Sequence, residues 1–395
     1  MKEQVQESGA RSVILPGSSI GILGGGQLGR MITLAGSAMG YRFVTLEPTP
    51  DSPCGQVAQQ ITAAYDDEAA ARELAQRCDV ITYEFENIDA GIAALLQRES
   101  YVPQGSELLY TTQHRLREKR AIEAAGVPVA PYREITSAES MEQAVQELGV
   151  PCVLKTATGG YDGKGQVVIR EVAAAAAAYQ QLAAGGTELV LEQFVSFQCE
   201  ISVIAARSPR GEIRTFPPAE NIHVNNILHT SIVPARVKAA VLEEAQQLAA
   251  AIAESMGAVG LLAVEMFVTK DGQLYVNELA PRPHNSGHYT MEACATSQFE
   301  QHVRAVCNLP LGDTRLLSPV VMVNVLGEHL EEAVARTGTA DPIADELKIV
   351  PKYHLYGKSE AKNGRKMGHI NLLCNQIEDG LQWIEQTNIW RNRNQ

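Results

Sequence analysis

The residues best suited to chemistry lie in a glycine-rich loop between two short apolar segments. Lys155 ends the segment VLK, and the loop GGYDGKGQ follows at Gly159 to Gln166, with Lys164 inside it. Its four glycines let backbone N–H groups turn toward one point and let a ligand approach closely. The two lysines add positive charge, so the stretch predicts a polyphosphate site. A hairpin that binds nothing is the alternative, and the loop alone does not decide between them.

Two glutamates, Glu265 and Glu278, lie on the arms of a predicted hairpin that is closed by Asp271 and Gly272. If the two side chains face each other among Leu, Val and Phe, burial and repulsion would raise the pKa of each carboxyl unless a cation lies between them. Mg²⁺ fits this position because it takes a few carboxylates and keeps positions for phosphate oxygens, and Asn277 offers one further oxygen. The alternative places the two acids on opposite faces of the sheet.

Together these two stretches predict ATP as a ligand. Lys155 and the loop would neutralise the phosphates, and the glutamates would hold the metal that bridges them. The edge Glu192 to Val195 could offer backbone groups to an adenine, and Glu200 could accept hydrogen bonds from ribose hydroxyls. The chain has no GxxxxGK[ST] motif and no HRD or DFG set, which excludes a P-loop protein and a protein kinase.

A third motif, GGGQLG at Gly24 to Gly29, follows a predicted strand and begins an apolar-periodic helix to about Met39. A second strand ends in Glu47, which is typical of a dinucleotide-binding unit. The same glycines serve any tight strand-to-helix turn in a doubly wound sheet. A regulator or dehydrogenase that binds a nicotinamide cofactor here is therefore the alternative function from a different class. It leaves Glu265, Glu278 and the second glycine loop without a role.

Two further groups of charged residues can each be interpreted either as part of a binding site or as solvated surface. Glu84 and Glu86, in TYEFEN, follow a predicted parallel strand, where they could hold a polar substrate or simply be solvated acids. The helical stretch Gln113 to Ala125 is rich in basic residues, and such a run is usually a solvated face. Its basic residues are Arg115, Arg117, Lys119 and Arg120.

Alternating strands and helices must position these side chains. The 395 residues predict two or three domains, and 45% hydrophobic with 20% charged residues is ordinary for a globular protein. The predicted strands are 19–23, 43–46, 79–82, 153–155, 167–169, 189–191, 201–206, 260–267 and 274–278. The predicted helices are 113–125, 137–148, 237–256 and 297–306, with the alanine run 173–178 inside another. After Leu309 we expect a smaller unit of strands and turns.

The composition also limits the kinds of partner that the protein can bind. A net charge of −13 argues against a nucleic-acid or anionic-membrane binder. Seven dispersed cysteines without a CxxC pair are typical of reduced thiols in the cytoplasm. The polar start has no signal-peptide pattern, and no apolar run reaches membrane-spanning length. We therefore predict a cytoplasmic protein with small-molecule partners, without nucleic acid or membrane.

The lysine strand, glycine loop, EQF edge and NE-containing hairpin resemble the ATP-grasp superfamily. Within it, six motifs closely resemble the N5-carboxyaminoimidazole ribonucleotide synthetase family, in unbroken order from Ser19 onward. They are GILGGGQLGRM, TYEFENID, GGYDGKGQ, ENIH, NELAPRPHNSGHYT and GRKMGHIN. The resemblance implies an ATP-dependent carbon–nitrogen ligase of purine biosynthesis. Such an enzyme converts ATP, bicarbonate and 5-aminoimidazole ribonucleotide, through carboxyphosphate, to the N5-carboxy product, ADP and phosphate. ATP-grasp enzymes that use another acceptor, such as formyl phosphate or an amino acid, remain an alternative.

The resemblance also implies an α/β ATP-grasp fold and the boundaries of its domains. We expect a leader at 1–17, a doubly wound parallel-sheet domain at 18–112, an ATP-grasp domain at 113–310 and a small C-terminal domain at 311–395. A lid at about 130–195 would include the mobile flap. A homodimer is expected. After ENIH the family usually has a charged residue and an Asp-Gly turn, whereas this chain has Val224, Asn225 and Asn226. Because Asn tolerates the left-handed conformation, we expect the same loop with altered mobility.

Residue roles carried over from the family fall into four groups. Catalysis is assigned to Lys155, Tyr161, Lys164, Arg282 and His284. The nucleotide is assigned to Arg115, Lys155, Gly160, Asp162, Gly163, Lys164, Gly165, Gln166, Glu192, Gln193, Phe194, Val195, Glu200, His223, Asn277 and Glu278. The ribonucleotide is assigned to Glu84, Tyr161, Asp162, Lys164, Arg282, His284, Asn285, Ser286, Lys358, Arg365 and Lys366. Glu265 and Glu278 are assigned to Mg²⁺, with Mn²⁺ as a substitute.

Overall fold

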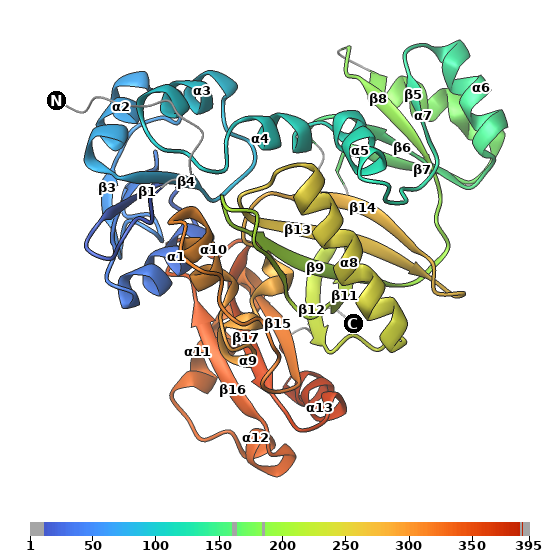
Figure 1. Cartoon of the computed structure of the whole chain (residues 1–395). Coiled ribbons are helices and arrows are strands. Elements are labelled where there is room, and N and C mark those ends of the chain that lie inside the picture. Colours follow the sequence, from blue (N-terminus) through green and yellow to red (C-terminus); the bar gives the residue numbers. More distant parts are fainter. Residues whose placement is uncertain (1–11, 160–163, 184–185, 388, 390–395) are drawn as a thin grey trace.

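The computed structural model describes residues 12–159, 164–183, 186–387 and 389 (Figure 1). Four predicted site residues, Gly160, Tyr161, Asp162 and Gly163, lie outside the described residues. We expected a loose leader up to residue 17, but its described part is held in place. The N–H of Ile14 donates to Cys307 O at 3.0 Å, and the Tyr41 hydroxyl donates to Ile14 O at 2.7 Å. These bonds attach the segment to Tyr41 in the N-terminal lobe and to Cys307 at the end of α10 (Gln298–Val306).

The N-terminal lobe is built on a parallel four-stranded sheet, in the order β3 (Gln59–Ile61), β2 (Arg42–Leu46), β1 (Ser19–Leu23) and β4 (Val80–Tyr83). Burial of the central strands explains their continuous apolar sequence. The predicted doubly wound parallel sheet is confirmed. Its helices are α1 (Gln27–Ala38), α2 (Glu68–Arg77) and α3 (Ala90–Glu99), and α4 (Glu107–Thr112) leads out of the lobe (Figure 1).

A second, antiparallel sheet lies at the upper right of Figure 1, within the range predicted as the lid, and we call this part of the chain the lid. Its order is β5 (Tyr132–Ile135), β8 (Leu189–Gln193), β6 (Cys152–Thr156) and β7 (Gln166–Ile169). Lys155 pairs with Gln166 across β6 and β7, so the predicted hairpin around the glycine loop is confirmed. Helices α6 (Ala138–Leu148) and α7 (Ala175–Ala183) pack together beside this sheet, and α5 (Arg115–Ala124) connects it to the rest.

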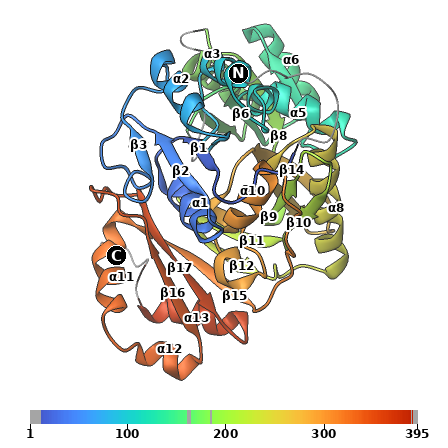
Figure 2. The same cartoon turned by 60° about the vertical axis from the view of Figure 1, so that its left-hand side comes forward.

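The central sheet has nine strands and joins the middle of the chain to its C-terminal part (Figure 2). Helix α8 (Ala239–Ser255) packs on one face, and α10 (Gln298–Val306) packs on the other, with α9 (Thr290–Ala293) nearby. Its order is β14 (Leu274–Ala280), β13 (Gly260–Thr269), β9 (Phe197–Arg207), β11 (Ala219–Val224), β12 (Ile227–Val233), β15 (Val320–Leu326), β17 (Lys366–Leu373) and β16 (Val350–Leu355), and β10 (Ile213–Thr215) pairs with β9.

The C-terminal unit corrects one prediction, because it is not made of strands and turns alone. It contains α11 (Leu330–Thr337), α12 (Pro342–Leu347) and α13 (Ile377–Thr387). Trp383 and Ile384 of α13 are buried against the sheet, and this apolar face stabilises a helix that we did not predict. The strands of the unit join the central sheet through the pairing of β12 with β15.

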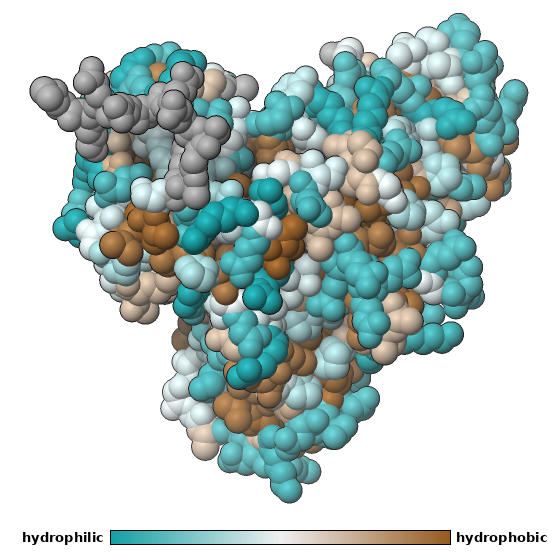
Figure 3. Space-filling view, in the orientation of Figure 1, coloured by the Kyte–Doolittle hydropathy of each residue, from teal (hydrophilic) through white to brown (hydrophobic). Residues whose placement is uncertain are grey.

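The surface is that of a chain whose apolar residues are mostly inside. In the face shown in Figure 3, hydrophilic residues predominate and hydrophobic ones occur in small patches. None of the described helices is long and apolar enough to cross a membrane. All seven cysteines lie in the described part, and each is a free thiol.

Candidate active site

The strand alternation of β13 brings Glu265 to the face opposite α8. Leu261 and Ala263 pack toward α10, and Glu265 continues this row. Glu265 pairs directly with Glu278 of β14, so the two acids lie on one face and the alternative of opposite faces is wrong. Burial and the charge of Glu278 raise the pKa of Glu265 to about 8. The register shifts after this pair, which leaves Asn277 as the extra residue of a bulge.

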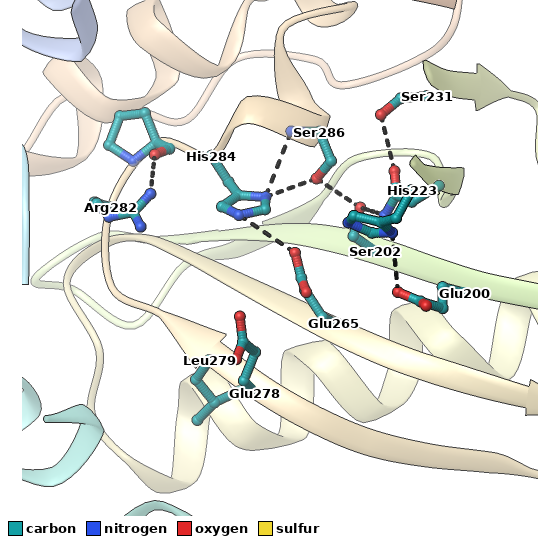
Figure 4. A network of polar contacts seen from close by, with 12 residues as sticks. Glu200, Ser202, His223, Ser231, Glu265, Glu278, Leu279, Arg282, His284 and Ser286 are labelled. Carbon is teal, nitrogen blue, oxygen red and sulfur yellow. Dashed lines mark hydrogen bonds and ion pairs between the residues drawn. The ribbon is translucent and has the colours of Figure 1, made fainter. Parts of the chain in front are cut away.

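Cationic and hydrogen-bonding groups surround the two acids. Arg115 Nη1 lies 3.7 Å from Glu278 Oε2, and His284 Nε2 lies 3.3 Å from Glu265 Oε1 (Figure 4). Burial, reinforced by nearby Arg282 and Lys366, holds the pKa of His284 well below its usual range. Burial therefore favours the neutral form of His284.

Two residues predicted around the nucleotide, Lys155 and Glu192, form a buried charge cluster with Lys119. Lys155 Nζ lies 2.9 Å from Glu192 Oε2, and Lys119 Nζ lies 3.3 Å from Glu192 Oε1. Burial opposes ionisation of Glu192, but Lys155 and Lys119 lower its pKa below the usual value. Gln193, Phe194 and Val195 follow at the end of β8, with Gln193 and Phe194 exposed.

Sequence reasoning missed Lys119, which we took to be part of a solvated helix face. Only 1% of its side chain is exposed, whereas 61% of the Arg120 side chain is. The signal was present in the sequence, because Leu116, Lys119 and Ile122 recur at helical spacing and all three are buried. Arg115, one turn before Lys119, lies next to Glu278 as described above.

Two further nucleotide candidates, Glu200 and His223, lie on β9 and β11. His223 Nδ1 is 3.2 Å from Glu200 Oε2. Although burial disfavours the charged ring, Glu200 raises the pKa of His223. The following turn departs from the family as noted, and Asn225 and Asn226 adopt left-handed φ values of 51° and 62°. The expected turn conformation is confirmed, while its mobility stays a prediction. Lys164 and Gly165 form a turn at the described end of the glycine loop, just before β7 begins at Gln166, and Lys164 is exposed.

Some residues predicted for the ribonucleotide lie near one another although they come from distant parts of the chain. Arg282 and Lys366 lie close enough to His284 to reinforce the effect of burial and lower its pKa. Arg282 forms an ion pair with Glu86, with Nη2 donating to Oε1 at 3.1 Å. Lys366 affects the pKa values of both Glu265 and His284. Burial, together with the charge of Arg365, lowers the pKa of Lys358 to about 8.

Some of these groups already have partners, and others do not. Lys358 Nζ donates to Lys366 O at 2.7 Å, and Arg365 Nη1 donates to Glu360 O at 2.8 Å. Asn285, by contrast, has a buried side-chain amide whose nitrogen and oxygen have no hydrogen-bond partner in the described part of the protein.

The GGGQLG turn is closed by the protein's own carboxylates. The two oxygens of Glu84 accept hydrogen bonds from the N–H groups of Gly26 and Gly29, and Glu47 Oε2 accepts from Gly25 at 2.9 Å. A cofactor pyrophosphate would need these same donors. The geometry therefore disfavours a dinucleotide here, and substrate binding by Glu84 stays a prediction.

The fit of these residues to Mg²⁺ rests on the acid pair and on Asn277. Glu265 and Glu278 repel each other, and the buried Oδ1 of Asn277 has no hydrogen-bond partner among the described residues. The described residues contain no group of three or more His, Cys, Asp or Glu that could hold a metal by themselves. Both observations are compatible with a Mg²⁺ site in which two carboxylates bind the ion and its other positions are left for phosphate oxygens.

A parallel-sheet lobe, an antiparallel lid and a central sheet with paired glutamates define an ATP-grasp protein. The model of the ATP-grasp domain matches residues 120–299. That of the ribonucleotide synthetase preATP-grasp domain matches 18–113, and that of the phosphoribosylaminoimidazole carboxylase C-terminal domain matches 320–382.

Individual relatives show which family of ATP-grasp proteins the chain resembles in sequence and structure. The chain is 54% identical to the N5-carboxyaminoimidazole ribonucleotide synthase of Bacillus subtilis, over 97% of this chain and 98% of that protein. A solved ADP complex of such a synthetase is 54% identical with a TM-score of 0.91, covering 97% of this chain and 99% of that one. The Aspergillus clavatus enzyme, solved with ADP and 5-aminoimidazole ribonucleotide, is 29% identical with a TM-score of 0.85, covering 94% and 97%. The chain belongs to the N5-carboxyaminoimidazole ribonucleotide synthase family.

Proposed function

We propose that the site between the lid, the β13–β14 hairpin and the C-terminal cations performs the family reaction with the residues described above. The chain is an ATP-dependent ligase that carboxylates 5-aminoimidazole ribonucleotide in purine biosynthesis. The observation that supports this placement best is the direct pairing of Glu265 with Glu278 beside Arg115 and His284.

The reaction proceeds in two steps. A bicarbonate oxygen attacks the γ-phosphorus of ATP, the bond to the bridging oxygen breaks, and ADP leaves carboxyphosphate behind. The exocyclic amine of the ribonucleotide then attacks the carboxyl carbon, or the CO₂ released from it. Phosphate leaves, and the nitrogen loses one proton as the C–N bond forms. Because both steps depend on placing charged reactants, positioning and positive charge are the main contributions of the protein.

Glu265 and Glu278 would hold Mg²⁺, with Asn277 as a further oxygen donor and Mn²⁺ as a substitute. When bound, the metal neutralises phosphate charge. Lys155, in the buried cluster with Glu192, lies on the strand that enters the glycine loop and so directs its charge toward the nucleotide. Arg115, Glu200 and His223 would line the same nucleotide, and Gln193 to Val195 would contact its base.

The acceptor would lie on the other side of His284. Arg282, Asn285 and Ser286 would orient it, and Lys358, Arg365 and Lys366 would bind its phosphate. Burial of such a cluster of cations is stabilised by an anion that accepts charge-assisted hydrogen bonds. The buried, unpartnered amide of Asn285 supports a polar ligand at this place.

Water must be kept from carboxyphosphate, since it hydrolyses quickly. The glycine loop Gly159–Gln166 would close over the site as a flap, with Tyr161, Asp162 and Lys164 reaching the ribonucleotide. We also infer a homodimer in the cytoplasm and the domain limits given above. The charge of −13 supports small-molecule partners, since nucleic acid would require a basic surface.

The decisive measurement is ADP release with bicarbonate, in the presence and absence of 5-aminoimidazole ribonucleotide. We expect release to be fast only with the ribonucleotide and to yield the N5-carboxy product. Release that is indifferent to this ribonucleotide but stimulated by another acceptor would contradict the assignment of the acceptor site.

A further inference from the structure

His284 touches Glu265 through one ring nitrogen and a serine through the other (Figure 4). Its Nδ1 lies 2.8 Å from Ser286 Oγ, and the backbone N–H of Ser286 also points at Nδ1, at 3.4 Å. A backbone N–H can only donate a hydrogen bond. Nδ1 is therefore an acceptor and holds no proton.

A row of buried polar side chains continues from Ser286 into the central sheet. Ser202 Oγ on β9 lies 2.7 Å from Ser286 Oγ, and Asn221 Nδ2 on β11 donates to Ser202 Oγ at 2.9 Å. Ser231 Oγ on β12 donates to Asn221 Oδ1 at 2.8 Å, and the two residues are direct cross-strand partners. All four side chains, Ser286 included, are buried, with at most 6% exposed.

The chemistry of these groups gives the row a single direction. Because the Ser231 hydroxyl donates to the amide oxygen of Asn221, the amide nitrogen faces Ser202 and can only donate to it. Ser202 then donates its one proton to Ser286, and Ser286 donates its own to His284. With Nδ1 accepting, the ring proton lies on Nε2, the nitrogen that faces Glu265.

We propose that Ser231, Asn221, Ser202 and Ser286 form a one-way hydrogen-bond relay that fixes the Nε2–H tautomer of His284. The Nε2–H then faces the carboxylate of Glu265, with 3.3 Å between Nε2 and Oε1, and would steady this carboxylate as a ligand for Mg²⁺. The four residues are positioning residues for a metal-binding carboxylate. This inference rests on the metal site of the proposed function.

Two substitutions test the direction of the relay. Asn221→Asp keeps the shape but replaces the donating amide nitrogen with an acceptor, so the hydroxyl bonds toward His284 should reverse and outweigh the long contact from the backbone N–H of Ser286. Ser202→Ala removes one link and leaves Asn221 in place. Asn324→Asp is the matched control, because Asn324 is fully buried in β15 of the same sheet and its Nδ2 donates to Leu228 O at 2.8 Å.

The first readout is ¹⁵N NMR of the imidazole nitrogens in the full-length enzyme, with His284→Gln identifying the signal of His284. We expect the proton on Nε2 in the unaltered enzyme and in Asn324→Asp, and on Nδ1 in Asn221→Asp. A proton on Nδ1 in the unaltered enzyme would overturn the relay, and so would an unchanged tautomer in Asn221→Asp.

The second readout is the Mg²⁺ dependence of ADP formation. Loss of a group that orients a metal ligand typically weakens metal binding about ten- to a hundred-fold. We expect half-saturating Mg²⁺ to rise by roughly this factor in Asn221→Asp and Ser202→Ala, and to stay unchanged in Asn324→Asp. An unchanged Mg²⁺ dependence in both relay variants would overturn the inference. Full activity of Glu265→Gln would instead refute the metal site itself, whatever tautomer NMR finds.

Discussion

A substitution of Glu278 gives the most direct test of the proposed metal site. Glu278→Gln keeps the size of the side chain and removes the charge that Arg115 and the metal would share. Because even indirect partners of a metal contribute about ten- to a hundred-fold, we expect kcat to fall by at least that factor. Steady-state ADP formation measures the loss, and thermal unfolding should show an intact fold. Near-normal turnover would mean that the metal lies elsewhere.

Lys119 sets the charge of the cluster around Glu192. With both lysines present, Glu192 is neutralised and one positive charge remains for the nucleotide. Lys119→Met should leave Lys155 neutralised by Glu192 and raise the KM for ATP by roughly tenfold, the range of a lost charge-assisted contact.

A second variant separates this role from simple packing. Lys119→Met combined with Glu192→Gln frees Lys155 again and should recover part of the affinity for ATP. The double-mutant cycle should give a coupling of about 1–3 kcal/mol. Strictly additive losses would show that Lys119 acts only as packing.

Lys358 predicts a pH dependence of acceptor binding. Burial and Arg365 lower its pKa to about 8, so the ammonium group is charged below this pH and loses its proton above it. The KM for the ribonucleotide should therefore be low at pH 7 and rise by roughly tenfold toward pH 9, one pKa unit corresponding to tenfold. In Lys358→Arg, which stays charged, this rise should disappear. A KM that is flat from pH 7 to pH 9 in the unaltered enzyme would exclude Lys358 from the phosphate site.

At the scale of elements, the turn before α1 shows why a glycine motif alone does not define a ligand. The N-terminus of a helix attracts anions, and here Glu84 and Glu47 occupy its donors. The glycines are needed because these carboxylates approach closely. A Cβ on Gly25 would lie 2.4 Å from Cγ of Glu47 and 2.5 Å from Oγ of Ser52.

Gly25→Ala should consequently destabilise the N-terminal lobe by about 1–3 kcal/mol, the usual cost of overpacking. Gly338→Ala is its control, because a Cβ there meets no atom within 4 Å and φ is −102°. Thermal unfolding of both variants tests the expectation. Equal melting temperatures would show that the turn relaxes at no cost.

At the scale of the whole molecule, the ATP hypothesis and the dinucleotide hypothesis differ in which ligand should stabilise the folded protein. ATP with Mg²⁺ should bridge the lid and the β13–β14 hairpin, and a ligand at a hundred times its Kd contributes about 2.7 kcal/mol. We expect ATP–Mg²⁺ to raise the melting temperature and NAD to leave it unchanged. The reverse result would revive a dinucleotide site at Gly24–Gly29.

The sequence by itself determined many, but not all, of the local elements. Short-range patterns predicted strands such as Ser19–Leu23, the hairpin around the glycine loop and the helix before β13, because apolar periodicity and turn residues act over a few positions. The motifs also predicted ATP and the family. The helix Ile377–Thr387 was missed, since its apolar face is recognisable only against the sheet that it covers.

Only the tertiary structure decided which charges meet. Lys119 looked like a surface residue until its distance to Glu192 placed it inside. For Glu84, a substrate ligand and a solvated acid were both open, and the structure shows its oxygens accepting from the Gly26 and Gly29 amides. The relay behind His284 joins residues 202, 221, 231 and 286, which have no common spacing in the sequence. Sheet order and register bring them together, and these depend on pairings between distant strands that no local pattern specifies.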